Sequence, residues 1–285
     1  MFDRVLVAMD LTPASEALVS ILPELKDFGT GELHLVHVAR PVAYPVSASI
    51  SALDGIRERL GNLQRTLEGK GFDVQVTVTT GAPAVKLCEL AEERGVDAIL
   101  VGSRSRNRVQ EAFVGSVAWE IVRRTQTPVL LQRIEPSRPD PESALEVRGS
   151  GLPNRILHPT DFSDLAERAF HWVEGMVDAG VKEVTLLHVH PVGDDVARSE
   201  ARVLLEARAE RLKRKGATEV EVKIRGGDPA EEILLSGATN PDYIVIMGTH
   251  GRGFLPEIVL GSESRQVVRR AVARVLLIPS ARSSA

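Results

Sequence analysis

Three glycines and a serine in the last quarter of the chain have the spacing of an anion-binding loop. Gly248 ends an apolar run, Gly251 follows three residues later, and nine residues separate Gly251 from the pair Gly261-Ser262. Glycine lets backbone N–H groups approach an anion closely and tolerates positive φ. A helix starting at Gly261-Ser262 adds free N–H donors and the positive end of its dipole, and Ser262 adds a hydroxyl. The pattern predicts a phosphate cradle that needs no lysine.

An acidic residue follows this cradle directly. Glu263 comes after Ser262 and would sit in the first helical turn, beside the predicted phosphates. Three interpretations stay open: it repels the phosphates, it shares a divalent cation such as Mg²⁺ with them, or it points away as an ordinary favourable first-turn acid. Either of the first two would alter phosphate affinity.

The same residue types recur in the first half of the chain because the sequence is duplicated. Asp10 falls on Asp161 at an offset of 151 residues, and Gly102 falls on Gly248 at an offset of 146, so the second copy is five residues shorter between its second and third strands. The matched segments are 4–19 with 155–170, 32–42 with 183–193, 81–91 with 227–237, 96–105 with 241–250, and 127–132 with 273–278.

Prolines mark the boundary between the copies. The sequence predicts a first domain over residues 1–134, a Pro/Gly-rich linker over 135–153, a second domain over 154–280 and a tail over 281–285. Proline removes backbone donors and restricts its neighbours. The linker is therefore expected to be exposed and partly stiff.

Within each copy, short β-branched runs alternate with helical patterns. The strands predicted in the first copy are residues 4–9, 32–38, 73–79, 97–101 and 128–132. Near-continuous apolar runs of this kind are typical of a parallel sheet covered on both faces. One helical stripe repeats at three and four residues through Leu53, Ile56, Leu60, Leu63 and Leu67. We predict two tandem, doubly wound, five-stranded parallel-sheet domains, each a three-layer α/β sandwich.

Such a sheet binds ligands beyond the carboxyl ends of its strands, where the strand order reverses. Thr12 before Pro13, and Ser163 before Asp164, are expected to be helix N-caps at this edge. His188 and His190 stand two apart on one strand, a spacing that suits a metal, but His37 takes the matching place in the other copy. A structural role is therefore preferred, and no metal site is predicted.

Other nucleotide and catalytic motifs do not occur in the sequence. There is no GxxxxGK[ST] loop, and Gly251-x-Gly253 lacks the third glycine of a dinucleotide fingerprint and follows the wrong strand. No Ser-His-Asp combination stands in a nucleophile-elbow context. No dedicated catalysis is predicted, with weak ATP hydrolysis at most.

Composition excludes several partners. The net charge of −4 gives no general attraction for nucleic acid or an anionic membrane, and only 4% of residues are aromatic. We find no apolar run of 18 residues and no signal-peptide pattern. The single cysteine, Cys88, is expected to be a buried thiol, which fits a cytoplasmic location.

Over nearly its whole length the sequence resembles the universal stress protein family in its tandem two-domain form. The elements that carry the resemblance are the Gly-x2-Gly-x9-Gly-Ser pattern, the aspartate of PTDFS (159–163), LLHVH (186–190) and GDPAEEIL (227–234). The resemblance implies an adenine-nucleotide alpha-hydrolase-like fold that binds ATP, ADP, AMP or another adenine nucleotide.

The resemblance also implies roles for residues of the second copy. Asp161 would contact the adenosine portion, and backbone around Val189 would meet the adenine edge. The ribose and phosphates would be held by Gly248, His250, Gly251, Arg252, Gly261 and Ser262, with Glu263 beside them. The alternative is that the glycines only form turns.

A second possible nucleotide site follows from the repeat. Its residues are Asp10, Val38, Gly102, Arg104, Gly115, Ser116 and Val117. The second glycine of the pattern is here Ser105, and a serine forced to φ > 0 costs roughly 1 kcal/mol or more. Arg104, Arg106 and Arg108 either offset this by charge-assisted hydrogen bonds or form a solvated face.

The leading hypothesis is therefore a regulatory protein of the stress response that binds an adenine nucleotide, mainly in its second domain. The alternatives are a slow ATPase using His250, Arg252 and Glu263, and a nucleotide-free scaffold whose first copy serves dimerisation. By the resemblance, the last strands of the two copies lie side by side, which makes the chain an intrachain pseudo-dimer. Whether two chains also form a homodimer stays open.

Overall fold

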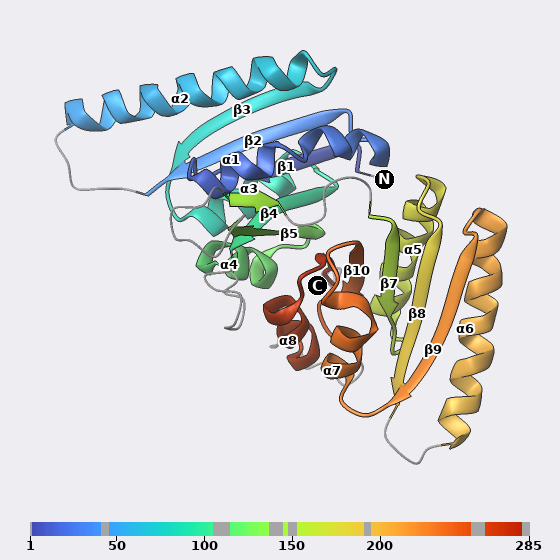
Figure 1. Ribbon diagram of the computed structural model, residues 1–285. Coiled ribbons are helices and arrows are strands. Elements are labelled where there is room, and N and C mark those ends of the chain that lie inside the picture. Colours follow the sequence, from blue (N-terminus) through green and yellow to red (C-terminus); the bar gives the residue numbers. More distant parts are fainter. Residues whose placement is uncertain are drawn as a thin grey trace.

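The short apolar runs of the sequence form strands of one continuous sheet (Figure 1). The first copy contributes β1 (Arg4–Ala8), β2 (Glu32–Ala39), β3 (Asp73–Thr80), β4 (Ala98–Arg104) and β5 (Val129–Pro136). The second copy contributes β7 (Arg155–Pro159), β8 (Glu183–His190), β9 (Glu219–Gly226), β10 (Tyr243–Gly248) and β11 (Arg274–Ile278). The strand order is β3-β2-β1-β4-β5-β11-β10-β7-β8-β9, and all neighbours within a copy are parallel. The order therefore reverses between β1 and β4, and again between β7 and β10.

This structure is a computed structural model, and it describes residues 2–40, 46–104, 115–136, 145–147, 153–190, 195–251 and 260–280. The predicted linker is partly strand. β5 runs on to Pro136, and a short strand β6 (Leu145–Val147) pairs with it antiparallel. Proline is tolerated at the end of an edge pairing, where its missing N–H removes no ladder bond.

Helices cover both faces of the sheet. In the first copy they are α1 (Pro13–Val19), the 3₁₀ helix η1 (Leu22–Phe28), α2 (Val46–Glu68), α3 (Pro83–Glu93) and α4 (Ser116–Arg124). In the second they are α5 (Asp164–Asp178), α6 (Asp195–Lys215), α7 (Pro229–Ile233), the π-helical turn η2 (Leu234–Ala238) and α8 (Ser262–Arg270). Among the described residues, none of these helices combines the length and apolarity needed to cross a membrane.

Alternation along the strands sorts buried side chains into two cores. Val7 of β1 packs in the core under α1, η1, α2, α5 and α6, whereas its neighbour Leu6 packs in the core under α3, α4, α7 and α8. Burial of the apolar stripe positions Leu60 and Leu67 holds α2 on the sheet. The predicted three-layer, doubly wound α/β fold in two tandem copies is confirmed.

The two copies join through their last strands, as predicted. β5 and β11 are antiparallel, with Leu130 opposite Leu276. These two leucines are 146 residues apart, which is the offset of the repeat, so their pair lies on a pseudo-twofold axis. Helices α2 and α6 lie at the two outer ends of the molecule (Figure 1).

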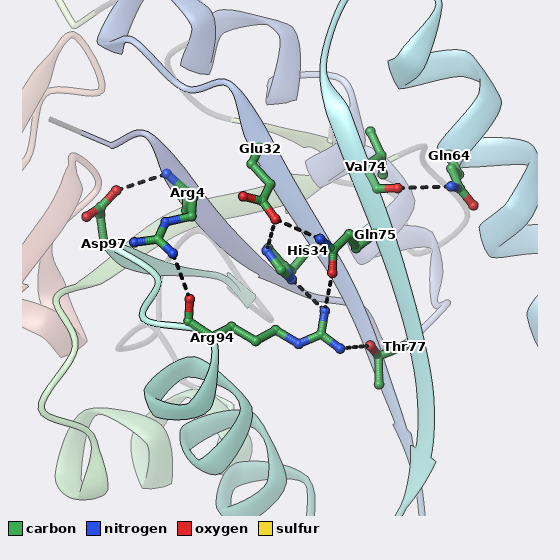
Figure 2. A network of polar contacts seen from close by, with 9 residues as sticks. All are labelled: Arg4, Glu32, His34, Gln64, Val74, Gln75, Thr77, Arg94 and Asp97. Carbon is green, nitrogen blue, oxygen red and sulfur yellow. Dashed lines mark hydrogen bonds and ion pairs between the residues drawn. The ribbon is translucent and has the colours of Figure 1, made fainter.

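A polar network braces the amino half of the first copy, away from the carboxyl edge (Figure 2). Arg94, the C-cap of α3, donates from Nη1 to Gln75 Oε1 at 2.8 Å and from Nη2 to Thr77 Oγ1 at 2.8 Å. Arg94 Nη1 also lies 2.7 Å from Nδ1 of the buried His34, whose Nε2 lies 2.7 Å from Glu32 Oε1. Burial lowers the pKa of His34. The guanidinium therefore ties α3 to β2 and β3.

Candidate functional site

A tight turn follows the first strand of the second copy and holds Asp161 at the carboxyl edge. The Asp161 carboxylate accepts from Ser163 through Oδ1, from the backbone N at 3.1 Å and from Oγ at 2.6 Å. Ser163 is the N-cap of α5 and accepts from the backbone N of Ala166 at 3.3 Å. Between them, Phe162 has a φ of 60°. The turn therefore fixes one carboxylate oxygen.

The first copy repeats this turn. Asp10 Oδ1 accepts from Thr12, from the backbone N at 3.0 Å and from Oγ1 at 2.5 Å. Thr12 is the N-cap of α1, but unlike Ser163 it makes no side-chain cap bond. Leu11 has a φ of 56°, and Leu11 and Phe162 are the only non-glycine residues with positive φ in the described chain. Strain of this kind persists only where surrounding contacts enforce it.

An arginine from the second helix of each copy supplies such contacts. Arg59 of α2 pairs with Glu16 and donates from Nη2 to the carbonyl of Leu11 at 3.2 Å. Arg208 of α6 pairs with Glu167, and its guanidinium stacks 4.6 Å from the ring of Phe162. Glu16 and Glu167 are themselves equivalent in the repeat, at an offset of 151 residues. We call these two pairs, Arg59–Glu16 and Arg208–Glu167, the arginine clamps.

Two equivalent histidines tie the second strand to the first. His37 donates from Nδ1 to the carbonyl of Met9, and His188 from Nδ1 to the carbonyl of Thr160, each at 2.8 Å. A carbonyl can only accept, so Nδ1 carries the proton in both rings. This geometry agrees with the structural role that the sequence indicates.

In the second copy, the backbone that carries the glycine pattern passes close to Asp161. A Cβ placed on Gly251 would lie 2.5 Å from Asp161 Oδ2, so the backbone passes directly against the carboxylate. Gly261 donates from its backbone N to the carbonyl of Thr249 at 2.8 Å, and Ser264 Oγ donates to the carbonyl of Gly248 at 3.1 Å. These bonds fix the start of α8 to the end of β10.

The start of α8 retains other donors. Gly261 is the N-cap and has no side-chain cap bond. Helix geometry leaves the N–H groups of Ser262, Glu263 and Ser264 without intrahelical acceptors. The Gly261 N–H itself is engaged, which differs from the cradle expected from sequence. An anion at this terminus would meet the amides that follow, next to the exposed Glu263.

The remaining predicted residues of the second copy are His250, Val189 and Arg252. His250 Nδ1 lies 3.1 Å from Thr249 Oγ1. Burial lowers the pKa of His250, against an opposing effect of Asp161. Val189 is half-buried near the end of β8. Arg252 lies outside the described residues.

In the first copy a cavity opens at the point where the strand order reverses. It has a volume of about 730 Å³ and is bounded by the ends of β1, β2 and β4 and by the starts of α3 and α4. Its lining includes six predicted residues, namely Asp10, Val38, Gly102, Gly115, Ser116 and Val117. We call it the nucleotide cavity. The side chains of Arg104, Arg106 and Arg108, and the whole of Ser105, lie outside the described part of the chain.

The nucleotide cavity also contains residues that the site prediction missed. Arg40 lies beyond β2, Pro83 and Leu87 belong to α3, and Ile134 of β5 covers Gly102, where an added Cβ would lie 2.6 Å from Ile134 Cδ1. The GAPAVKL segment, which aligns with GDPAEEIL, is the sequence signal that leads to Pro83. Nothing in the sequence leads to Ile134, because its contact with Gly102 depends on the pairing register of β4 with β5, in which Gly102 lies opposite Gln132 and Ile134 lies two residues further along.

The fold defines a class of tandem α/β proteins in which one sheet carries two equivalent carboxyl edges. The sequence model of the Universal stress protein family matches residues 1–133 and 153–279. Because these matches cover most of the chain, the protein belongs to the universal stress protein family, in its tandem form.

Individual relatives agree with this assignment. A universal stress protein of Mycobacterium tuberculosis is 25% identical over 264 residues, covering 86% of each chain. The protein YxiE of Bacillus subtilis is 28% identical over 148 residues, which covers 47% of this chain and 100% of that protein. A solved universal stress protein of Archaeoglobus fulgidus shares the fold with a TM-score of 0.74 at 23% identity, over 98% of this chain and 99% of that one.

Proposed function

We propose that this protein binds an adenine nucleotide at the carboxyl edge of its sheet and acts as a regulator in the stress response. The observation that carries the proposal is the nucleotide cavity, where Asp10, the end of β2 and the uncapped start of α4 meet. A volume of about 730 Å³ lies within the range of small-molecule sites, about 300–1,000 Å³. Occupancy would alter the arrangement of the two copies or the affinity for a partner.

The recognition chemistry follows from the lining of the nucleotide cavity. A carboxylate such as that of Asp10 suits the hydroxyls of a ribose, and Val38 gives backbone groups that suit a purine edge. Helix geometry leaves the first N–H groups of α4 without intrahelical acceptors, and the N-cap Gly115 provides no side-chain cap bond. They point to where phosphates would lie.

Both copies are proposed as sites, on different grounds. The sequence favours the second copy because its glycine pattern is complete, and the turn at Asp161 has the same carboxylate hydrogen bonds as the turn at Asp10. The first copy departs from the pattern at Ser105 but has the described cavity. Two sites of unequal affinity are therefore expected.

Calorimetric titration with ATP, ADP, AMP and cAMP tests the proposal; cAMP is the ligand of one solved universal stress protein. Asp10→Ala is expected to abolish binding in the first copy only, and Asp161→Ala in the second only. Asp73→Asn, at the exposed amino end of β3, is the matched control and should bind as the parent does. Absence of heat with all four nucleotides, and of any nucleotide released on denaturation, would overturn the proposal.

Slow ATP hydrolysis and a nucleotide-free scaffold stay as alternative predictions. A phosphate-release assay on the parent and on the Asp10→Ala/Asp161→Ala double variant separates slow hydrolysis from simple binding, and the calorimetric titration separates binding from a nucleotide-free scaffold. Equal rates in both proteins exclude hydrolysis at these sites. The cytoplasmic location and a role for Mg²⁺ stay predictions as well; repeating the titration with EDTA tests the latter.

A further inference from the structure

A second cavity adjoins the nucleotide cavity in the first copy. It has a volume of about 630 Å³ and lies between the start of α3, over residues 81–85, and α4, from Ser116 to Arg124. Four residues line both cavities: Arg40, Pro83, Ser116 and Val117. We call the second cavity the side pocket. The two spaces therefore meet at the first turn of α4.

The side pocket has one apolar wall and one charged wall. Ala82, Pro83 and Val85 form the apolar wall on α3. Across from them lie Arg40 and Arg124, with Glu120 bonded to Arg124 Nε at 2.6 Å. Two guanidinium groups against one carboxylate give the pocket a net positive charge. A flat guanidinium also stacks on nucleobases.

We propose that the side pocket holds the second nucleoside of a dinucleoside polyphosphate. The first adenosine lies in the nucleotide cavity, so the inference rests on the proposed function. The phosphate chain crosses at Ser116 and Val117, whose N–H groups are those left free by the helix start. The second base lies between the apolar wall and Arg40, and Glu120 accepts from its amino group. A mononucleotide would leave this second space unfilled.

The second copy lacks the apolar wall of the side pocket. At an offset of 146 residues, three apolar positions become acidic: Ala82 corresponds to Asp228, Val85 to Glu231, and Val117 to Glu263. Glu231 is engaged by Arg270, the counterpart of Arg124. Asp228 and Glu231 replace the apolar wall with charge, and Glu231 occupies the arginine. The dinucleotide site is therefore specific to the first copy.

Titration with P1,P4-di(adenosine) tetraphosphate and with ATP, both on the Asp161→Ala background, tests the proposal. The dinucleotide is expected to bind at least tenfold more tightly than ATP. The double variant Ala82→Asp/Val85→Glu installs residues that the second copy already accommodates, at positions that do not line the nucleotide cavity. It should bring the dinucleotide down to the affinity of ATP while the affinity for ATP stays unchanged.

Asn62→Asp/Thr66→Glu adds the same two charges on the exposed side of α2 and should change neither affinity. Glu120→Gln, an exposed position outside the nucleotide cavity, is a second variant that does not depend on α3 and should weaken only the dinucleotide. Equal affinities of the Asp161→Ala protein for both ligands overturn the inference and leave the proposed function standing. If neither ligand binds to the Asp161→Ala protein or to the parent, both fall.

Discussion

The contact between Gly251 and Asp161 makes the second-copy site sensitive to a single methyl group. Gly251 does not have a positive φ, so the need for glycine comes from close approach. Gly251→Ala is expected to displace the Asp161 carboxylate, to destabilise the fold by about 1–3 kcal/mol as overpacking does, and to weaken nucleotide binding in the second copy. Urea unfolding and calorimetry measure the two effects.

Gly115→Ala is the control for this substitution. Its φ is −54°, and an added Cβ there would meet nothing within 4 Å. Its stability should equal that of the parent. If Gly251→Ala is equally silent, the loop does not lie against the carboxylate as described.

A buried histidine gives the second copy its own pH dependence. His158 is fully buried, and burial lowers its pKa to about 4, while its Nδ1 donates to the carbonyl of Ile246 at 2.8 Å. The unfolded chain binds this proton near pH 6.5. Stability is therefore full above pH 6.5 and is lost as the pH falls from 6.5 towards 4, by about 3 kcal/mol in all.

Substitution by valine tests this dependence, because Val7 takes the matching place in the first copy. His158→Val should remove the loss between pH 6.5 and 4 that belongs to this residue, so the difference in unfolding free energy from the parent should grow steadily as the pH falls. Urea unfolding at several pH values measures it. A difference that is constant with pH would contradict the assignment.

At the level of helices and strands, the two arginine clamps differ in burial and should therefore contribute differently to stability. The Arg208 side chain is 13% exposed and covers Phe162, whereas the Arg59 side chain is 51% exposed. Arg208→Ala loses packing as well as charge and is expected to cost about 2 kcal/mol of stability and to weaken nucleotide binding in the second copy. Arg59→Ala should cost under about 1 kcal/mol, since exposed ion pairs are screened.

Thermal unfolding of the two variants, with nucleotide titration on each, makes the comparison. Equal losses of stability in the two variants would mean that stacking of Arg208 on Phe162 does not stabilise the turn. A loss of stability in Arg208→Ala without any change in binding would limit the clamp to a structural role.

The arginine clamps could not be predicted from the sequence, unlike other parts of the site. The repeat alone aligned Asp10 with Asp161. Gly-Ser pairs predicted that α4 starts at Ser116 and α8 at Ser262. The positive φ of Leu11 and Phe162 was out of reach, because neither residue type favours that conformation. It is imposed by a hydrogen-bonded aspartate on one side and an arginine from a distant helix on the other. Long-range contacts of this kind leave no local pattern.

The strands were predicted more completely than the connector. Apolar runs define β1 to β5 within a few residues, because burial on both faces demands them. β6 was missed, since prolines around it indicate a loop and its three residues gain order only by pairing with β5. Tertiary pairing outweighed local preference there.

For the whole molecule, the pseudo-twofold axis joins two similar halves, but one ion pair between them has no counterpart in the repeat. Arg274 at the start of β11 is 6% exposed and lies 3.6 Å from Glu24 of η1. Their counterparts in the repeat are Pro128 and Gly175, so no second pair balances this one. Burial lowers the pKa of Arg274, and Glu24 opposes that change. Within the described part of the chain, Glu24 is the ion-pair partner of Arg274 at this junction.

A buried charge that loses its partner is costly, whereas removing both charges together is often neutral. Glu24→Gln is therefore expected to lower the unfolding free energy by about 2 kcal/mol, and the double variant Glu24→Gln/Arg274→Met to regain most of it. Because the pair joins the two copies, the single variant should also separate their unfolding into two transitions in urea, followed by circular dichroism. A single variant as stable as the parent, or a double variant no better than the single one, would mean that this ion pair does not contribute to the coupling of the copies.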